Sequence, residues 1–266
     1  MIKKENMMKK LLSATLLAAA FSSPVLASPE GELHFGVDPS YPPYEWKQAD
    51  GSLTGFDVDI GNAICKELEV KCVWVETSFD GIIPALKVKK FDAILSALVV
   101  NEKRLKQIDF TDKISQNSDF LVAKKGTLKS TDAKDLKGLV IAAEQGSIQS
   151  DYAKAHYAKQ GVKVKAYASS QQLVQDLKTG RVDGAVMSGA VADSLVFEQE
   201  GGDNYAIVGE ALKDEKIQGN SYIAIGVRKG DEETKNNINK GIAAILENGI
   251  YQTISKKYFS FDTYGG

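Results

Sequence analysis

The chain carries the same helix-then-strand pattern twice, and this repetition restricts its possible folds more than any other feature of the sequence. In the first half, an amphipathic segment over residues 82–88 precedes a buried strand over residues 91–98, which starts in the stretch 90–94 (KFDAI). In the second half, a helical segment over residues 170–179 precedes the stretch 181–185 (RVDGA). Such alternation is typical of parallel sheets covered by helices on both faces. The sequence therefore predicts an α/β fold of two similar lobes, each a mainly parallel sheet flanked by helices.

The end of the chain has no strand partner close to it in the sequence. A strand over residues 222–227 and a helical stretch over 234–258 are therefore expected to return to the first lobe. Lobe 1 would then comprise residues 28–118 and 222–266, and lobe 2 residues 119–221, with crossings near 118–124 and 219–226. A two-strand hinge of this kind allows closure around a ligand. Because ligands of open α/β sheets bind beyond the carboxyl ends of the strands, we expect the site in the cleft between the lobes.

The first 27 residues have the pattern of a secretory signal peptide. Lysines at positions 3, 4, 9 and 10 precede an apolar run over residues 11–21, and the segment ends in small residues at Ala27. The run is too short to cross a bilayer, which takes about 20 apolar residues. We therefore predict cleavage after Ala27 and a periplasmic location for the rest of the chain.

Cys65 and Cys72 are the two cysteines of the sequence, seven positions apart. In a secreted chain this pattern favours one disulfide that closes a small loop, with two free buried thiols as the alternative. A metal site needs more ligands than two cysteines and the two histidines, His34 and His156, provide. We expect the bridge to stabilise the fold and to take no part in chemistry.

Several functional classes are disfavoured by charge and motif content. The formal net charge is −2, whereas nucleic-acid binding needs a concentrated basic face. Neither histidine lies beside a recognisable nucleophile motif, and there is no glycine-rich phosphate loop. We therefore expect a binding protein without enzymatic activity, metal or cofactor.

Six short stretches, taken in their order and spacing, resemble the polar amino acid-binding family of periplasmic proteins that serve ABC importers. They are residues 38–45 (DPSYPPYE), 55–59 (GFDVD), 79–84 (FDGIIP), 91–95 (FDAIL), 102–104 (EKR) with 110–111 (FT), and 256–262 (KKYFSFD). The similarity is strongest to the branch that binds lysine, arginine, ornithine or histidine. It implies the two-lobed periplasmic binding protein fold, a monomer, and ABC permease subunits of the inner membrane as partners.

The resemblance also implies a set of ligand-binding residues. Tyr41 and Phe79 stand where the family sandwiches the ligand side chain between two aromatic rings, and Arg104 stands where it grips the ligand carboxylate. The remaining predicted contacts fall into three groups: Ser96, Ala97 and Val99 before the arginine; Ser147, Ile148 and Gln149 in the second lobe; and the acidic pair Asp38 and Glu144. If both acids face the cleft, they favour a guanidinium or ammonium terminus, although Glu144 could equally point to solvent.

One departure from the family bears on the ligand. Where the family has an aspartate that accepts the ligand's α-ammonium, this chain has Ser188, and a neutral hydroxyl loses a charge-assisted contact. Asp193, one helical turn further on, could compensate. The departure leaves open a carrier of opines, whose amino nitrogen bears a second acid arm. Two alternatives stay open on other grounds: a sensor that presents its ligand to a receptor, and, with least support, a dehydratase-like enzyme of the same fold.

Overall fold

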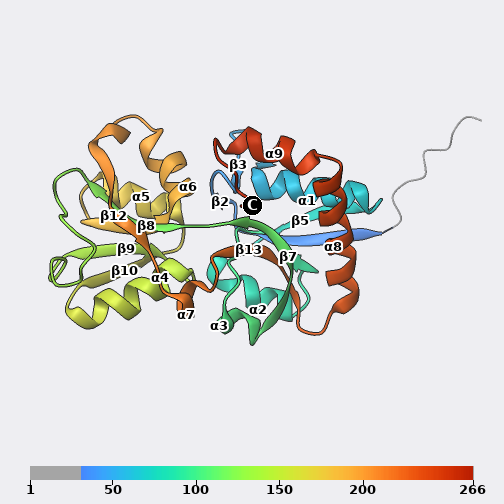
Figure 1. The fold of residues 1–266 in the computed structure, drawn as a ribbon, viewed down its shortest axis with the longest axis horizontal. Coiled ribbons are helices and arrows are strands. Elements are labelled where there is room, and N and C mark those ends of the chain that lie inside the picture. The colour runs from blue at the N-terminus through green and yellow to red at the C-terminus, as the bar shows by residue number, and fades with distance from the viewer. Residues whose placement is uncertain (1–30, 266) are drawn as a thin grey trace, which may run out of the picture.

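The computed structural model describes residues 31–265, which form two α/β lobes lying side by side (Figure 1). The first 30 residues, and with them the predicted signal peptide, lie outside the described part of the chain. Each lobe contains one five-stranded sheet with helices on its faces. The two-lobed α/β fold predicted from the sequence is confirmed.

The sheet of lobe 1 has the strand order β5-β1-β6-β13-β7. β1 runs parallel to β5 and β6, whereas β13 runs antiparallel to β6 and β7. The strands are β1 (Glu32–Val37), β5 (Lys71–Glu76), β6 (Ala93–Ile94), β7 (Ile108–Gln116) and β13 (Tyr222–Arg228). The helices are α1 (Phe56–Glu67), α2 (Ile82–Lys87), α3 (Glu102–Leu105), α8 (Glu232–Glu247) and α9 (Ile250–Tyr258), with a 3₁₀ turn at Phe79–Gly81. A small antiparallel sheet is formed by β2 (Ser40–Tyr41), β3 (Glu45–Lys47) and β4 (Leu53–Thr54).

The sheet of lobe 2 has the order β10-β9-β11-β8-β12, in which β8 is antiparallel to both of its neighbours. Its strands are β8 (Asp119–Lys124), β9 (Val140–Glu144), β10 (Lys163–Tyr167), β11 (Gly184–Ser188) and β12 (Tyr205–Leu212). Its helices are α4 (Ile148–Tyr152), α5 (Ser170–Lys178), α6 (Gly189–Ala192) and α7 (Glu215–Gln218). α4 and α6 continue into π-helical turns at Ala153–Tyr157 and Asp193–Phe197, and 3₁₀ turns occupy Ala158–Gln160 and Gly202–Asn204.

The chain passes between the two sheets at residues 117–118, from β7 to β8, and at residues 213–221, from β12 to β13. Figure 1 shows both crossings side by side in the middle of the molecule. The second crossing contains α7 and leads the end of the chain back to lobe 1. Across the described residues, every helix is too short or too polar to cross a bilayer.

The C-terminal helices pack on α1 of lobe 1. Gly241 of α8 lies so close to α1 that a Cβ atom there would come within 2.7 Å of the Ile64 side chain. The ring of Phe56, at the start of α1, meets Tyr251 and Phe259 edge-on, with centroids 5.9 and 5.2 Å apart. Burying such rings against each other is a large apolar contribution to stability, which fixes the end of the chain to the lobe where it began.

Two predicted elements differ from the structure. The predicted helix over 234–258 is divided into α8 and α9 by Gly249, whose left-handed φ of 80° is compatible with a turn and not with a continuous helix. The apolar run 91–98 was predicted as a continuous strand, but only Ala93–Ile94 belongs to the sheet. After Ile94 the backbone leaves the sheet, and Ala97 takes a left-handed φ of 44°.

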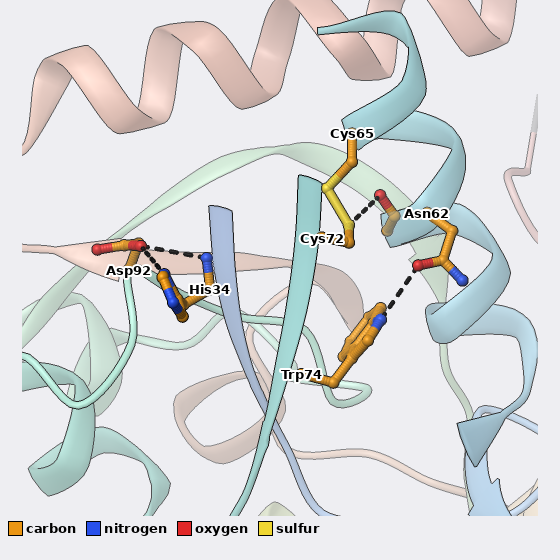
Figure 2. The surroundings of a disulfide bond; sticks show 7 residues. His34, Asn62, Cys65, Cys72, Trp74 and Asp92 are labelled. Atoms are coloured by element: carbon orange, nitrogen blue, oxygen red, sulfur yellow. Dashed lines mark hydrogen bonds and ion pairs between the residues drawn. A yellow bond between two sulfur atoms is a disulfide. The ribbon is translucent and has the colours of Figure 1, made fainter. Parts of the chain in front are cut away.

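The predicted disulfide is confirmed. Cys65 near the end of α1 is bonded to Cys72 at the start of β5, with Cα atoms 5.7 Å apart (Figure 2). The same helix and strand are joined by a hydrogen bond from the Trp74 indole to the Asn62 side chain, 3.1 Å long. The bridge lies at the β5 edge of the lobe 1 sheet, and neither cysteine lines the cavity between the lobes.

Removing the bridge is expected to destabilise lobe 1 without changing the site. For the double variant Cys65→Ala/Cys72→Ala, the loop-closure model gives a loss of about 2.5 kcal/mol in the free energy of unfolding. In a chain of this size, that corresponds to a melting temperature lower by roughly 5–10 °C. Calorimetry of the variant, with reduced wild-type protein as the control, measures the loss. An unchanged melting temperature would contradict a stabilising role for the bridge.

Candidate ligand-binding site

A cavity lies between the two lobes, lined by residues of both. Residues from the segments after β1 and β6, from the first crossing, from β13 and from the start of α4 line it together. They are Asp38, Tyr41, Tyr44, Glu45, Phe79, Ala97, Val99, Arg104, Asn117, Glu144, Ser147, Ile148, Gln149 and Ile223. Ten of the twelve residues predicted from the sequence are among them, and Ser96 and Ser188 are not. As ligand contacts these residues stay predictions.

Arg104 is a buried cation without an anionic partner among residues 31–265. Its helix α3 begins at Asn101, whose side chain accepts the Arg104 amide at 2.9 Å. The guanidinium is held by the Val99 carbonyl at 2.7 Å and lies over the Phe79 ring, 5.4 Å from its centroid. Only 6% of the residue is exposed, and burial lowers its pKa to about 10, so it stays charged at neutral pH. A buried positive charge that opens into a cavity is suited to binding a carboxylate.

The two predicted acids both line the cavity. Asp38, after β1, accepts the Ser40 hydroxyl at 2.6 Å and the Phe79 amide at 2.7 Å, and burial raises its pKa. Glu144, at the end of β9, is 5% exposed and accepts the Ser170 hydroxyl at 2.5 Å. Burial, and next to it the charge of Asp38, raises the pKa of Glu144 to about 8. The two carboxyl groups come from opposite lobes and line the same cavity.

The floor of the cavity rests on a buried pair of carboxyl groups from β3 and α1. Glu45 accepts the Ser96 hydroxyl at 2.8 Å, and Asp57 accepts the Ala97 amide at 2.6 Å. Burial raises the pKa of both acids, and each is influenced by the other. These bonds hold Ala97 in its left-handed conformation, and they also occupy its N–H. The main-chain N–H of Ala97, one of the predicted ligand contacts, therefore donates to Asp57.

Lobe 2 contributes the start of α4. The Ser147 side chain caps this helix by accepting the Ser150 amide at 3.0 Å, and its hydroxyl donates to the Glu144 carbonyl at 2.6 Å. Gln149 is the second residue of the helix, and its amide Nε2 is 3.4 Å from the hydroxyl oxygen of Tyr41 across the cleft. The cap therefore fixes the direction from which Gln149 enters the cavity.

Sequence reasoning missed four lining residues, namely Tyr44, Glu45, Asn117 and Ile223. Tyr44 and Glu45 belong to the same proline-rich stretch as the predicted contact Tyr41, and this proximity in the sequence is the one feature that indicates them as site residues. Ser188 lies behind the wall, where its hydroxyl donates to Asn117 Oδ1 at 2.6 Å. Asp193, considered as a substitute acid, is exposed and does not line the cavity.

The lobes are in contact at the mouth of the cavity. Lys103 in α3 is paired with Asp151 in α4 at 2.7 Å, and the Gln145 side chain donates to Asp80 at 2.8 Å. Gly146 lies so close to the backbone of Asp80 that a Cβ atom on residue 146 would be 2.7 Å from the Cα atom of Asp80. The structure therefore represents the closed arrangement of the two lobes.

Two α/β lobes joined by two crossings and closed over a buried cavity define a solute-binding protein of the hinge-closing class. The family model of bacterial extracellular solute-binding proteins, family 3, matches residues 33–261, and the chain belongs to this family. The family resemblance drawn from the six stretches is thereby confirmed.

Named relatives of the chain are amino acid-binding proteins. It is 42% identical to an L-arginine-binding protein of Pseudomonas aeruginosa over 97% of this chain and 99% of the relative. It is 38% identical to a histidine-binding periplasmic protein of Salmonella typhimurium over 97% of this chain and all of the relative. A solved structure of an ancestral arginine-binding protein bound to arginine has a TM-score of 0.79 and 35% identity, covering 87% of this chain and all of that one.

Proposed function

We propose that this protein captures a basic amino acid in the periplasm and delivers it, as a monomer, to the permease subunits of an ABC importer. The observation that carries the proposal is the arrangement of charge in one cavity, with Arg104 unpaired in one wall and the carboxyl groups of Asp38 and Glu144 in the others. An amino acid with a cationic side chain offers its carboxylate to Arg104 and its side-chain cation to Asp38 and Glu144. The names of the relatives support the same ligand class.

The proposed mechanism of capture is closure of the two lobes around the ligand. The ligand would bridge lobe 1, through Arg104 and Asp38, to lobe 2, through Glu144 and Gln149. Because these contacts are complete only when the lobes are together, the ligand shifts the population toward the closed form. The closed form is the one that we expect the permease to recognise.

The test is calorimetric titration of unfolded and refolded, ligand-free protein with L-arginine, L-lysine, L-ornithine and L-histidine. L-Citrulline, which replaces the guanidinium of arginine by a neutral urea, is the matched control. Binding of the basic amino acids at least tenfold more tightly than citrulline is expected. Equal affinity for arginine and citrulline would overturn the assignment of the acidic end of the cavity.

Two other functions are separated by adding octopine to this panel and by a transport assay. An opine carrier would prefer octopine to arginine, which the neutral Ser188 left open. A periplasmic sensor would bind the same ligand but would stimulate no uptake, so transport by vesicles that contain the permease distinguishes it. The relatives are named as binding proteins, which supports binding without catalysis.

The raised pKa of Glu144 makes arginine binding dependent on pH. With the lobes closed and no ligand between them, the carboxyl group is mainly protonated at pH 7, whereas a bound guanidinium favours the ionised form and lowers its pKa. Binding therefore releases a proton, and affinity rises between pH 6 and pH 8, by up to about tenfold per pH unit. Two neighbouring groups also act on the pKa of Glu144: the hydrogen bond from the Ser170 hydroxyl lowers it, and the charge of the facing Asp38 raises it.

Titrations at pH 6, 7 and 8 in buffers of different ionisation enthalpy measure both the affinity and the released proton. Citrulline should show a much smaller slope, and the variant Glu144→Gln should lose most of the slope for arginine. If this variant retains the full pH dependence, another group is responsible for it.

A further inference from the structure

Asp119 is a buried carboxyl group that no cation of the described chain approaches within ion-pair distance. It stands at the start of β8, is 2% exposed, and accepts three amide hydrogen bonds. Oδ1 accepts the side-chain amides of Asn117 and Gln149, each at 2.7 Å, and Oδ2 accepts that of Gln218 at 2.7 Å. Burial raises the pKa of this group, and the three amide donors counteract the increase. Such a group is costly to bury unless a cation is close to it.

The contacts of Asp119 decide which atoms line the cavity. An ionised carboxylate can only accept hydrogen bonds, so the NH₂ groups of Asn117 and Gln149 must point to it. Both residues line the cavity. Asn117 Oδ1 accepts the Ser188 hydroxyl, while Gln149 Oε1 has no hydrogen-bond partner within residues 31–265. This wall of the cavity therefore offers the free acceptor Gln149 Oε1 to a ligand, and the negative charge of Asp119 lies behind it.

Asp119 also joins the two hinge crossings. It follows the first crossing at residues 117–118 directly, and Gln218 belongs to α7 in the second crossing. Gln149 adds the start of α4 in lobe 2. A ligand group that is attracted to this wall therefore acts on both crossings at once.

We propose that Asp119 is a positioning residue that selects ligands with a free ammonium group, acting through Asn117 and Gln149. The inference rests on the proposed function, and it places the counter-charge for the ligand's amino group at the hinge instead of at the end of β11, where Ser188 stands. An ammonium group next to this wall is attracted by the charge of Asp119. The second acid arm of an opine would be repelled by the same charge.

The experiment compares two ligands that differ in one group. L-Arginine and 5-guanidinopentanoic acid share the carboxylate and the guanidinium, but the second lacks the amino group. Wild-type protein is expected to bind arginine at least tenfold more tightly. In Asp119→Asn, affinity for arginine should fall roughly 10- to 100-fold, as for the loss of a charge-assisted contact, while affinity for the analogue changes less than about threefold.

Two further variants separate positioning from general stability. Asp203→Asn is the matched acid-to-amide change at an exposed position of lobe 2, and it should alter neither affinity. Adding Ser188→Asp to Asp119→Asn places a carboxylate beside Asn117, and it should restore arginine affinity at least tenfold without improving binding of the analogue.

The following results would overturn the proposed role of Asp119. An equal loss for both ligands in Asp119→Asn shows a merely structural role and overturns the inference, as does tighter binding of octopine than of arginine by the wild type. If Asp119→Asn does not fold, Asn117→Ala is measured instead, with an expected loss of roughly three- to tenfold for arginine alone. An unselective or absent effect there also overturns the inference. If the wild type binds neither ligand, the proposed function fails, and the inference fails with it.

Discussion

Replacing Arg104 by alanine is expected to weaken arginine binding by about 2–5 kcal/mol, or roughly 30- to 5,000-fold. The guanidinium is buried in the cavity wall, over the Phe79 ring, and no carboxylate of the described chain pairs with it. In the proposed complex it meets the ligand carboxylate away from water. The variant would leave that carboxylate buried without a counter-charge, and this is where most of the loss comes from.

The free protein should tolerate the same change. Burial of the unpaired guanidinium is unfavourable, as its lowered pKa shows, so its removal relieves a cost that partly offsets the lost bond to the Val99 carbonyl. We expect the melting temperature of the ligand-free variant to stay within a few degrees of the wild type. Arg181→Ala, at an exposed position of lobe 2, is the matched control and should leave affinity unchanged. If Arg104→Ala retains wild-type affinity for arginine, the carboxylate site lies elsewhere.

Gly146→Ala is expected to hinder closure of the lobes and to reduce affinity roughly 10- to 100-fold. A Cβ atom at this position would lie 2.7 Å from Cα and 3.0 Å from Cβ of Asp80 in the opposite lobe. The nearer atom belongs to the backbone and cannot rotate away, so the lobes must separate. The site would then lose contacts that exist only in the closed form.

The left-handed φ of 77° at Gly146 adds a local cost of about 1–2 kcal/mol for alanine, and this cost needs its own control. Gly138→Ala provides it, because Gly138 has a φ of 86° and open space around its missing Cβ. Both variants should lose similar stability, but only Gly146→Ala should lose affinity. Small-angle scattering with saturating arginine should show a larger radius of gyration for Gly146→Ala alone. Equal affinities of the two variants would show that this approach does not limit closure.

Much of the secondary structure could be predicted because it depends on local periodicity. The helix predicted over residues 170–179 is α5 at Ser170–Lys178, and the strand predicted over residues 222–227 is β13 at Tyr222–Arg228. The run 91–98 shows the limit of this reasoning. Its apolar residues predict a continuous strand, but the backbone turns at Ala97 because Asp57, forty positions earlier, accepts the Ala97 amide.

The sequence by itself determined the two lobes, the disulfide and the family, because apolar periodicity, paired cysteines and short ordered stretches are all local in the chain. It also indicated Arg104, Asp38 and Glu144 as candidate site residues. Only the tertiary structure decided the charge around them. In the sequence, Asn117 and Asp119 are two polar residues of a connecting segment. Asp119 is a buried carboxyl group because Gln149 and Gln218, far away in the sequence, pack against it and donate hydrogen bonds to it. Burial and pKa depend on every residue that packs around a group, and that packing is created by the fold as a whole.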